Sequence, residues 1–258
     1  MTTATIDLTG YSYSVFYQIV LAASLPGKSR NDAALDFNKG SSMTGLHWGG
    51  WAVWLIILLL TYPKEFYPKF RQERDYQHLV LGSAVALFVL WSLRAGLVDG
   101  LQVHFLALTV LALSHGWRIA IWISVIPSLL LAAFGLVDWQ DLGMMNLTGV
   151  IAPAMISYGI FLLSYRFLNR HLFVYIFVAA FFNGAFSQVV YMLLTGGWVW
   201  LEGEFSGQYI VDNFLILIPL LLFPEGLLNG MATTLLVVYK PEWVRTFYER
   251  DYIYKRDQ

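Results

Sequence analysis

The chain has 258 residues, of which 58% are hydrophobic and 13% are charged, and its formal net charge is -1. Soluble domains usually carry about 25% charged residues, so this composition is typical of a protein embedded in a bilayer. The balanced charge provides no basic surface for nucleic acid. The lack of cysteine excludes disulfides, Cys-ligated metals and thiol nucleophiles. Any site chemistry must therefore use His, carboxylate, amide, hydroxyl or backbone groups.

Uncharged apolar runs predict where the chain crosses the membrane. A bilayer core of roughly 30 Å needs about 20 mostly apolar residues per helix. Seven segments approach that length: about 46–62, 79–97, 101–117, 118–137, 147–165, 172–196 and 210–239. The third is short, and it is predicted to be either a tilted span or a re-entrant element buried in protein. We therefore predict an all-α polytopic membrane bundle of about seven transmembrane helices.

Lys and Arg residues predict the orientation, because they are enriched in cytoplasmic loops. They occur at 63–78, at 166–171 and in the tail, whereas the loops at 138–146 and 197–209 have none. This pattern predicts an N-out, C-in topology in the cytoplasmic (inner) membrane. Arg94 is an exception near the outer end of its span. The predicted organisation is an extracytoplasmic or interfacial segment over 1–45, a transmembrane domain over 46–239 and a cytoplasmic tail over 240–258.

The first 45 residues leave two alternatives open. The apolar run at 11–25 is too short to span comfortably, and it lacks a basic n-region and a small-residue cleavage site. An interfacial helix is favoured over a cleaved signal. Translation can also start at Met1 or at Met43, and the second start would bring His47 close to the amino terminus.

Polar groups within apolar spans are costly and are therefore candidate functional residues. Glu225 follows Pro224, whose missing N–H is predicted to interrupt the helix, and Asn229 lies one turn later on the same face. Asn183 lies near the middle of the sixth span, and Asp99 precedes the third. These four polar residues are predicted to line a substrate path. The alternative for Glu225 and Asn183 is a role in helix packing.

Two histidines are candidate metal ligands, because neutral imidazole binds cobalt, nickel, copper and zinc. His104 lies in the short third segment near the predicted outer surface. His47 opens the first span at the same predicted level, so the two are predicted to form a pair. The sequence contains no GxSxG, HExxH or Walker A motif, so we expect no enzymatic activity, no permanently bound cofactor and no ATP hydrolysis by the chain itself.

Two stretches carry a resemblance to a known family. In VHFLALTVLALSHGWRIA, His104 is followed about a dozen positions later by Gly116 and Trp117. In PEGLLNGMATTLLVVYKPEW, a Glu-Gly pair precedes an apolar run that ends in Lys, Pro and Glu. Over roughly residues 43 to 243 the chain resembles the CbiM/NikM type of substrate-capture subunit of energy-coupling-factor (ECF) transporters.

The resemblance implies a permease subunit that captures Co²⁺ or Ni²⁺ and passes it to a transmembrane coupling subunit driven by ATPase subunits. In the family, an amino-terminal Met-His segment and the His of the third segment hold the metal. Only the latter carries over, onto His104, because the chain begins MTTATID. His47 would replace the missing ligand if Met43 is the start. Two other functions stay open: an accessory or scaffold subunit of a larger complex, and an intramembrane enzyme or proton-coupled protein using Glu225 and His104.

Overall fold

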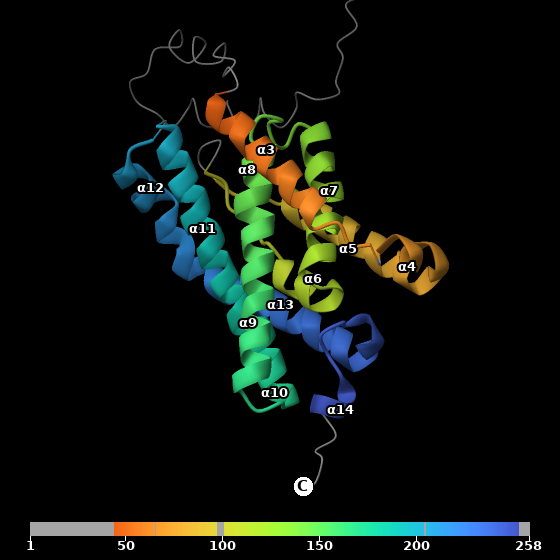
Figure 1. Cartoon of the computed structure of the whole chain (residues 1–258). Coiled ribbons are helices and arrows are strands. Elements are labelled where there is room, and N and C mark those ends of the chain that lie inside the picture. The colour runs from red at the N-terminus through yellow and green to blue at the C-terminus, as the bar shows by residue number, and fades with distance from the viewer. Residues whose placement is uncertain (1–43, 65, 97–100, 204, 253–258) are drawn as a thin grey trace, which may run out of the picture. The chain divides into compact units, whose positions relative to one another are not determined.

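The computed structural model describes residues 44–64, 66–96, 101–203 and 205–252, without the side chains of 249 and 251. Within these ranges the chain is helical, with no strand and one isolated bridge between Ala95 and Val103 (Figure 1). This confirms the predicted all-α membrane bundle. The predicted segment 1–45, apart from its last two residues, and the candidate Asp99 lie outside the described residues.

Most helices overlap the predicted apolar segments, whereas the short helix α4 lies in the predicted loop at 63–78. Separate helices are α3 (Gly45–Leu60), α4 (Phe66–Gln72), α5 (Arg74–Ser92), α6 (Leu108–His115) and α7 (Trp117–Ala133). Two continuous helical stretches have a π-helical middle part. The first consists of α8 (Leu142–Asn146), η1 (Leu147–Ile151) and α9 (Ala152–Phe167). The second consists of α10 (Leu172–Val174), η2 (Tyr175–Phe182) and α11 (Asn183–Glu202). The last part contains α12 (Gly207–Asn213), η3 (Leu215–Leu217), α13 (Ile218–Tyr239), η4 (Pro241–Trp243) and α14 (Glu249–Tyr252).

In the part of the chain that the structure describes, three helical stretches are long and apolar enough to cross a membrane: Leu142–Phe167, Leu172–Glu202 and Gly207–Tyr239. The apolar helices α3 and α7 are shorter, at 16 and 17 residues. The count of seven spans and the N-out, C-in orientation therefore stay predictions.

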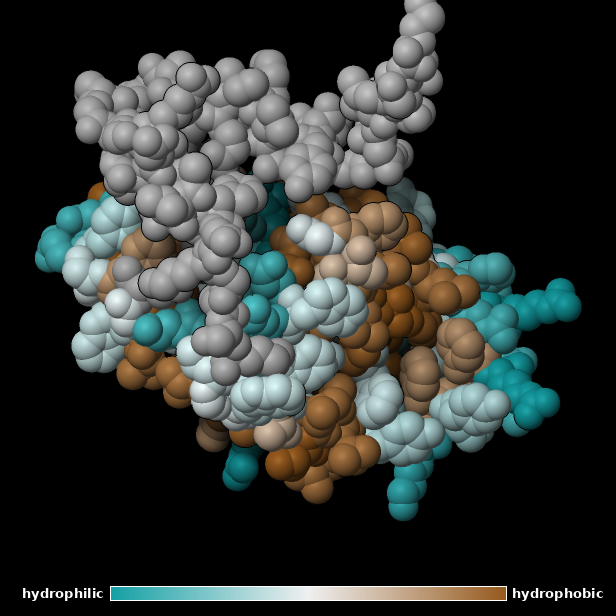
Figure 2. All heavy atoms as spheres, turned by 90° about the horizontal axis from the view of Figure 1, so that it is seen from above, coloured by the Kyte–Doolittle hydropathy of each residue, from teal (hydrophilic) through white to brown (hydrophobic). Residues whose placement is uncertain are grey.

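Helix α13 shows how the bundle separates its lipid-facing and inner surfaces. Its exposed positions are large and apolar and recur at helical spacing: Leu220, Phe223, Leu227, Met231, Leu235 and Val238. Its buried positions are mostly small or polar: Glu225, Gly226, Asn229, Gly230, Thr233 and Val237. Small inner residues let helices approach closely, and apolar outer ones suit lipid. Figure 2 shows hydrophobic residues at the periphery of the bundle.

The third apolar segment is interrupted. Residues 101–107 are not helical, and α6 then runs for 8 residues, with seven of them buried. The segment starts beside α5, where Val103 pairs with Ala95, and ends beside the tail, where the Ser114 carbonyl accepts from the Arg245 N–H. It is therefore enclosed by protein and is not a continuous tilted helix. Irregular backbone is tolerated at membrane depth only in such surroundings.

The predicted break at Pro224 is wrong. Helix α13 continues from Ile218 to Tyr239 with Pro224 inside it. Proline removes one backbone hydrogen bond, but neighbouring groups in a membrane bundle can accommodate that loss. The interruption that shapes the bundle lies in the third segment, opposite Glu225, and not in the helix that carries Glu225.

Candidate functional site

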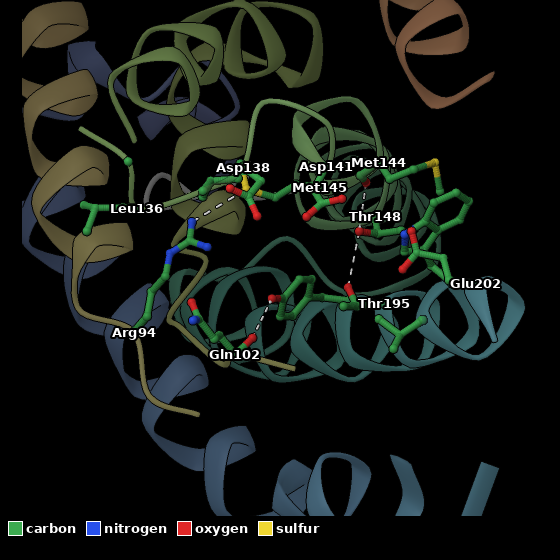
Figure 3. A pocket seen from close by; sticks show the side chains of 15 residues that line it. Arg94, Gln102, Leu136, Asp138, Asp141, Met144, Met145, Thr148, Thr195 and Glu202 are labelled. Carbon is green, nitrogen blue, oxygen red and sulfur yellow. Dashed lines mark hydrogen bonds between the residues drawn. The ribbon is translucent and has the colours of Figure 1, made fainter. Parts of the chain in front are cut away.

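A polar cavity of about 270 Å³ lies between the loop after α7, helices α8 and α11, and the segment that follows α5 (Figure 3). Its lining includes three carboxylates, Asp138, Asp141 and Glu202, and one guanidinium, Arg94. The formal charge of these four groups is -2. A concave site with this charge raises the local concentration of cations. In Figure 3, Asp141 and Glu202 lie on the same side of the cavity as Thr148 and Thr195, away from Arg94.

His47 joins two of these carboxylates. Its Nε2 atom is 3.1 Å from Asp141 Oδ1 and 3.1 Å from Glu202 Oε1. One ligand atom from each of the three residues lies within 4.8 Å of the other two. The side chain of His47 is 10% exposed, that of Glu202 is 16% exposed and that of Asp141 is 46% exposed. The cluster is therefore partly buried, with its open side at Asp141.

Close packing of α3 against α8 brings this cluster together. A Cβ atom added at Gly143 would lie 2.6 Å from the backbone nitrogen of Trp51 and 2.7 Å from the carbonyl carbon of Gly50, so the two backbones touch. The Trp51 Nε1–H also donates to the Trp139 carbonyl over 3.0 Å. These contacts hold Asp141, just before α8, next to His47 on the first turns of α3.

His104 lies in the non-helical segment 101–107 and is buried, with 5% of its surface exposed. Its Nδ1 atom is 3.3 Å from the hydroxyl of Tyr191, which itself lines the cavity. Among the described residues, the cluster of ligand atoms around His47 does not include His104. The structure thus gives His47 two carboxylate neighbours and places His104 behind Tyr191. The predicted pairing of the two histidines stays a prediction.

Glu225 and Asn229 hold the interrupted segment in place. The Leu106 and Ala107 N–H groups each donate to the Glu225 carboxylate over 2.9 Å, and the Asn229 Nδ2 group donates to the same carboxylate over 2.8 Å. Asn229 Oδ1 in turn accepts from the Val110 N–H over 2.9 Å. The amide groups at the start of α6 would otherwise lack partners. These contacts give Glu225 and Asn229 a structural role. Their predicted place on a substrate path stays a prediction.

Asn183 also makes structural contacts. Its Nδ2 group donates to the Ser157 carbonyl over 2.8 Å and to the Ala179 carbonyl over 2.9 Å, so it links α9 to η2. Beside it, the hydroxyl of Ser157 lies 2.6 Å from that of Thr109 and 2.8 Å from that of Ser187. The contacts of Asn183 match the packing alternative considered for it.

We expect Asn183→Ala to lower stability without changing metal binding. The change leaves buried carbonyls without their side-chain donor, which costs about 1–3 kcal/mol. The apparent melting temperature of the purified protein in detergent would fall, while a Co²⁺ titration would give the wild-type dissociation constant. A weaker Co²⁺ affinity at unchanged stability would instead place Asn183 on the substrate path.

The sequence indicated His47 but not Asp141 or Glu202, because acidic residues in polar loops are common. One signal could have found them. The loops at 138–146 and 197–209 are free of Lys and Arg, contain these acids, and were predicted to lie on the same side as His47. Carboxylates on one face beside an imidazole are a possible ligand set for a divalent ion.

The helical bundle and its apolar exterior define a polytopic membrane protein. A family model described as "CbiM: Cobalt uptake substrate-specific transmembrane region" matches residues 43–243. The chain belongs to this family. It is therefore a membrane transporter component and not an enzyme.

A solved structure has the same fold. It is described as a transition metal transporter, and it shares 16% sequence identity with the chain at a TM-score of 0.60. The match covers 76% of this chain and 88% of the other. No curated protein matches the chain. At this identity the solved structure supports the architecture alone.

Proposed function

We propose that the chain is the substrate-capture subunit of an ECF-type transporter that takes up Co²⁺ or Ni²⁺ across the cytoplasmic membrane. The observation that carries this proposal is the cavity of about 270 Å³, whose lining has three carboxylates against one guanidinium, in a member of a cobalt uptake family. A cation gains favourable interactions in such a cavity, whereas an anion meets net repulsion.

The proposed partners follow from what the chain lacks. The sequence contains no Walker A motif. Uphill transport by this subunit therefore requires energy from other proteins, and we assign that role to a transmembrane coupling subunit and ATPase subunits. The chain's own contribution is to select the cation and present it within the bundle.

His104 is proposed as an inner ligand of the transported ion. Its imidazole is buried, and it lies one side chain behind the cavity because Tyr191 separates them. An ion that moves from the cavity to His104 would meet the Tyr191 hydroxyl, which lies 3.3 Å from His104 Nδ1. Imidazole is a suitable ligand for both cobalt and nickel.

Uptake of radioactive cobalt into cells that carry the chain with its coupling and ATPase subunits tests this function. We expect wild-type cells to accumulate cobalt, and His104→Ala to reduce accumulation by at least about tenfold, the loss typical of weakened metal coordination. His78→Ala is the matched control, because His78 is exposed on α5. Wild-type cells that accumulate no more cobalt or nickel than cells without the chain would overturn the proposed function.

A further inference from the structure

We propose that His47, Asp141 and Glu202 form a divalent-metal site that receives the cation at the cavity before it moves deeper into the bundle. This site differs from the predicted pair of His47 with His104, because its other ligands are carboxylate oxygens, one from the residue before α8 and one from the end of α11. The assignment of cobalt or nickel as its natural occupant rests on the proposed function.

The spacing of the donor atoms fits a bound ion. Zinc and similar ions hold imidazole nitrogen and carboxylate oxygen at about 2.0–2.2 Å, so two adjacent ligands around one ion lie about 3 Å apart. Asp141 Oδ1 and Glu202 Oε1 each lie 3.1 Å from His47 Nε2. Small side-chain movements would therefore place one ion in contact with all three atoms. The remaining coordination positions would be open to water on the exposed side of Asp141.

The charges of the cluster favour the same conclusion. A neutral imidazole can donate one proton from Nε2, yet two carboxylates approach that atom at the same distance. The two carboxylate oxygens lie within 4.8 Å of each other, so their negative charges repel, and the side chain of Glu202 is only 16% exposed to screening solvent. A divalent cation neutralises both carboxylates and binds the imidazole nitrogen.

The surroundings of His47 orient the ring for this role. Its Nδ1 atom lies 2.6 Å from the hydroxyl of Thr44, and Trp198 packs edge-on against the ring with centroids 6.1 Å apart. In this structure Nδ1 also accepts from the Thr44 N–H over 3.3 Å. When a metal occupies Nε2, the proton moves to Nδ1, so this backbone hydrogen bond is given up and Nδ1–H donates to Thr44 Oγ1 instead. A hydrogen-bond partner on the nitrogen that does not bind the metal fixes the tautomer and the direction of a ligating imidazole.

One nitrogen and two oxygen donors select a class of ion. Imidazole favours late first-row metals, whereas carboxylates also accept harder ions such as Mn²⁺. The cluster therefore suits Co²⁺, Ni²⁺ and Zn²⁺ and discriminates weakly among them. A site of this kind collects divalent ions at the cavity, and stricter selection is left to ligands further inside.

Titration of the purified full-length chain with Co²⁺ alone tests the site. We expect Asp141→Asn and Glu202→Gln each to weaken Co²⁺ binding by at least about tenfold, since each removes a charged ligand but keeps the side-chain shape. Asp212→Asn is the matched control, because Asp212 is an exposed carboxylate on α12 that belongs neither to the cavity lining nor to the cluster. Its dissociation constant should stay within about twofold of the wild-type value, as expected for a carboxylate that does not touch the ion.

X-ray absorption of Co²⁺ bound to the wild-type chain gives a second readout that needs no variant. We expect a shell dominated by oxygen with a single imidazole. Wild-type affinity in both Asp141→Asn and Glu202→Gln, or a shell with two or more imidazoles, would overturn the site and indicate that these three residues form only an ion-pair cluster. In that case the uptake of radioactive cobalt by wild-type cells would still support the proposed function, whereas failure of uptake would remove the function itself.

Discussion

Glu225→Ala is expected to lower the free energy of unfolding more than Asn183→Ala, Gly143→Ala or any other substitution named above or below. The change removes the acceptor for the Leu106 and Ala107 N–H groups and for Asn229 Nδ2. Each buried donor that loses its partner costs about 1–3 kcal/mol, so the combined loss is on the order of 3 kcal/mol or more. Because the same contacts fix the segment that carries His104, cobalt uptake should fall with stability.

Two further substitutions make the Glu225 result specific. Glu225→Gln keeps one acceptor oxygen and should lose less stability than Glu225→Ala. Glu242→Ala removes a carboxylate that is 60% exposed and pairs with Lys240, so its effect should lie within about 1 kcal/mol. Apparent melting temperatures in detergent would rank the three variants. Equal melting temperatures for Glu225→Ala and the wild type would contradict the role of this carboxylate in holding the interrupted segment.

Gly143→Ala is expected to have the second large effect. The added methyl group would lie 2.6 Å from the Trp51 nitrogen, and a backbone atom cannot rotate away as a side chain can. Helix α8 must therefore shift from α3, at a cost of about 1–3 kcal/mol, the usual range for overpacking. The shift also moves Asp141 away from His47, so Co²⁺ binding should weaken together with stability.

The matched control for this packing prediction lies on the opposite helix. Gly49 is on α3, and a Cβ atom added there meets nothing within 4 Å. Gly49→Ala should therefore be neutral or stabilising by up to about 1 kcal/mol, because Ala is a better helix former. Melting temperature and Co²⁺ affinity would both be measured. If Gly143→Ala matched Gly49→Ala in both, the close contact between α3 and α8 would not determine the site.

Hydropathy predicted most of the helices because a bilayer imposes length and polarity on each span. It could not show that the third segment is irregular before Leu108, because hydropathy depends on composition and is the same for a helical and a non-helical apolar run. The break depends on Ala107, which has a positive φ of 52°, and on a carboxylate 118 residues further along the chain. Only tertiary structure brings these two together. The same limit explains why Pro224 was wrongly expected to interrupt α13.

The candidate site was predictable in part. His47 could be identified because an imidazole at the start of an apolar span is unusual and chemically informative. Asp141 and Glu202 could not be singled out from the other acids. The approach of Asp141 to His47 depends on the tight contact at Gly50 and Gly143, and Glu202 approaches from the end of α11. Glycines in α3 give no sign in the sequence of which one faces another helix.

The hydrogen bonds between Glu225 and the backbone determine which substitutions the segment 101–107 can accept during evolution. Its carboxylate contacts backbone N–H groups, so these bonds make no demand on the side chains at 106 and 107. At 107 the demand is on backbone conformation, and Gly or Asn enters the left-handed region as readily as Ala or more so. Descendant sequences can therefore carry any of these residues at 107, whereas β-branched residues are eliminated there. The position that must keep its amino acid is 225, because the carboxylate of Glu225 accepts both hydrogen bonds.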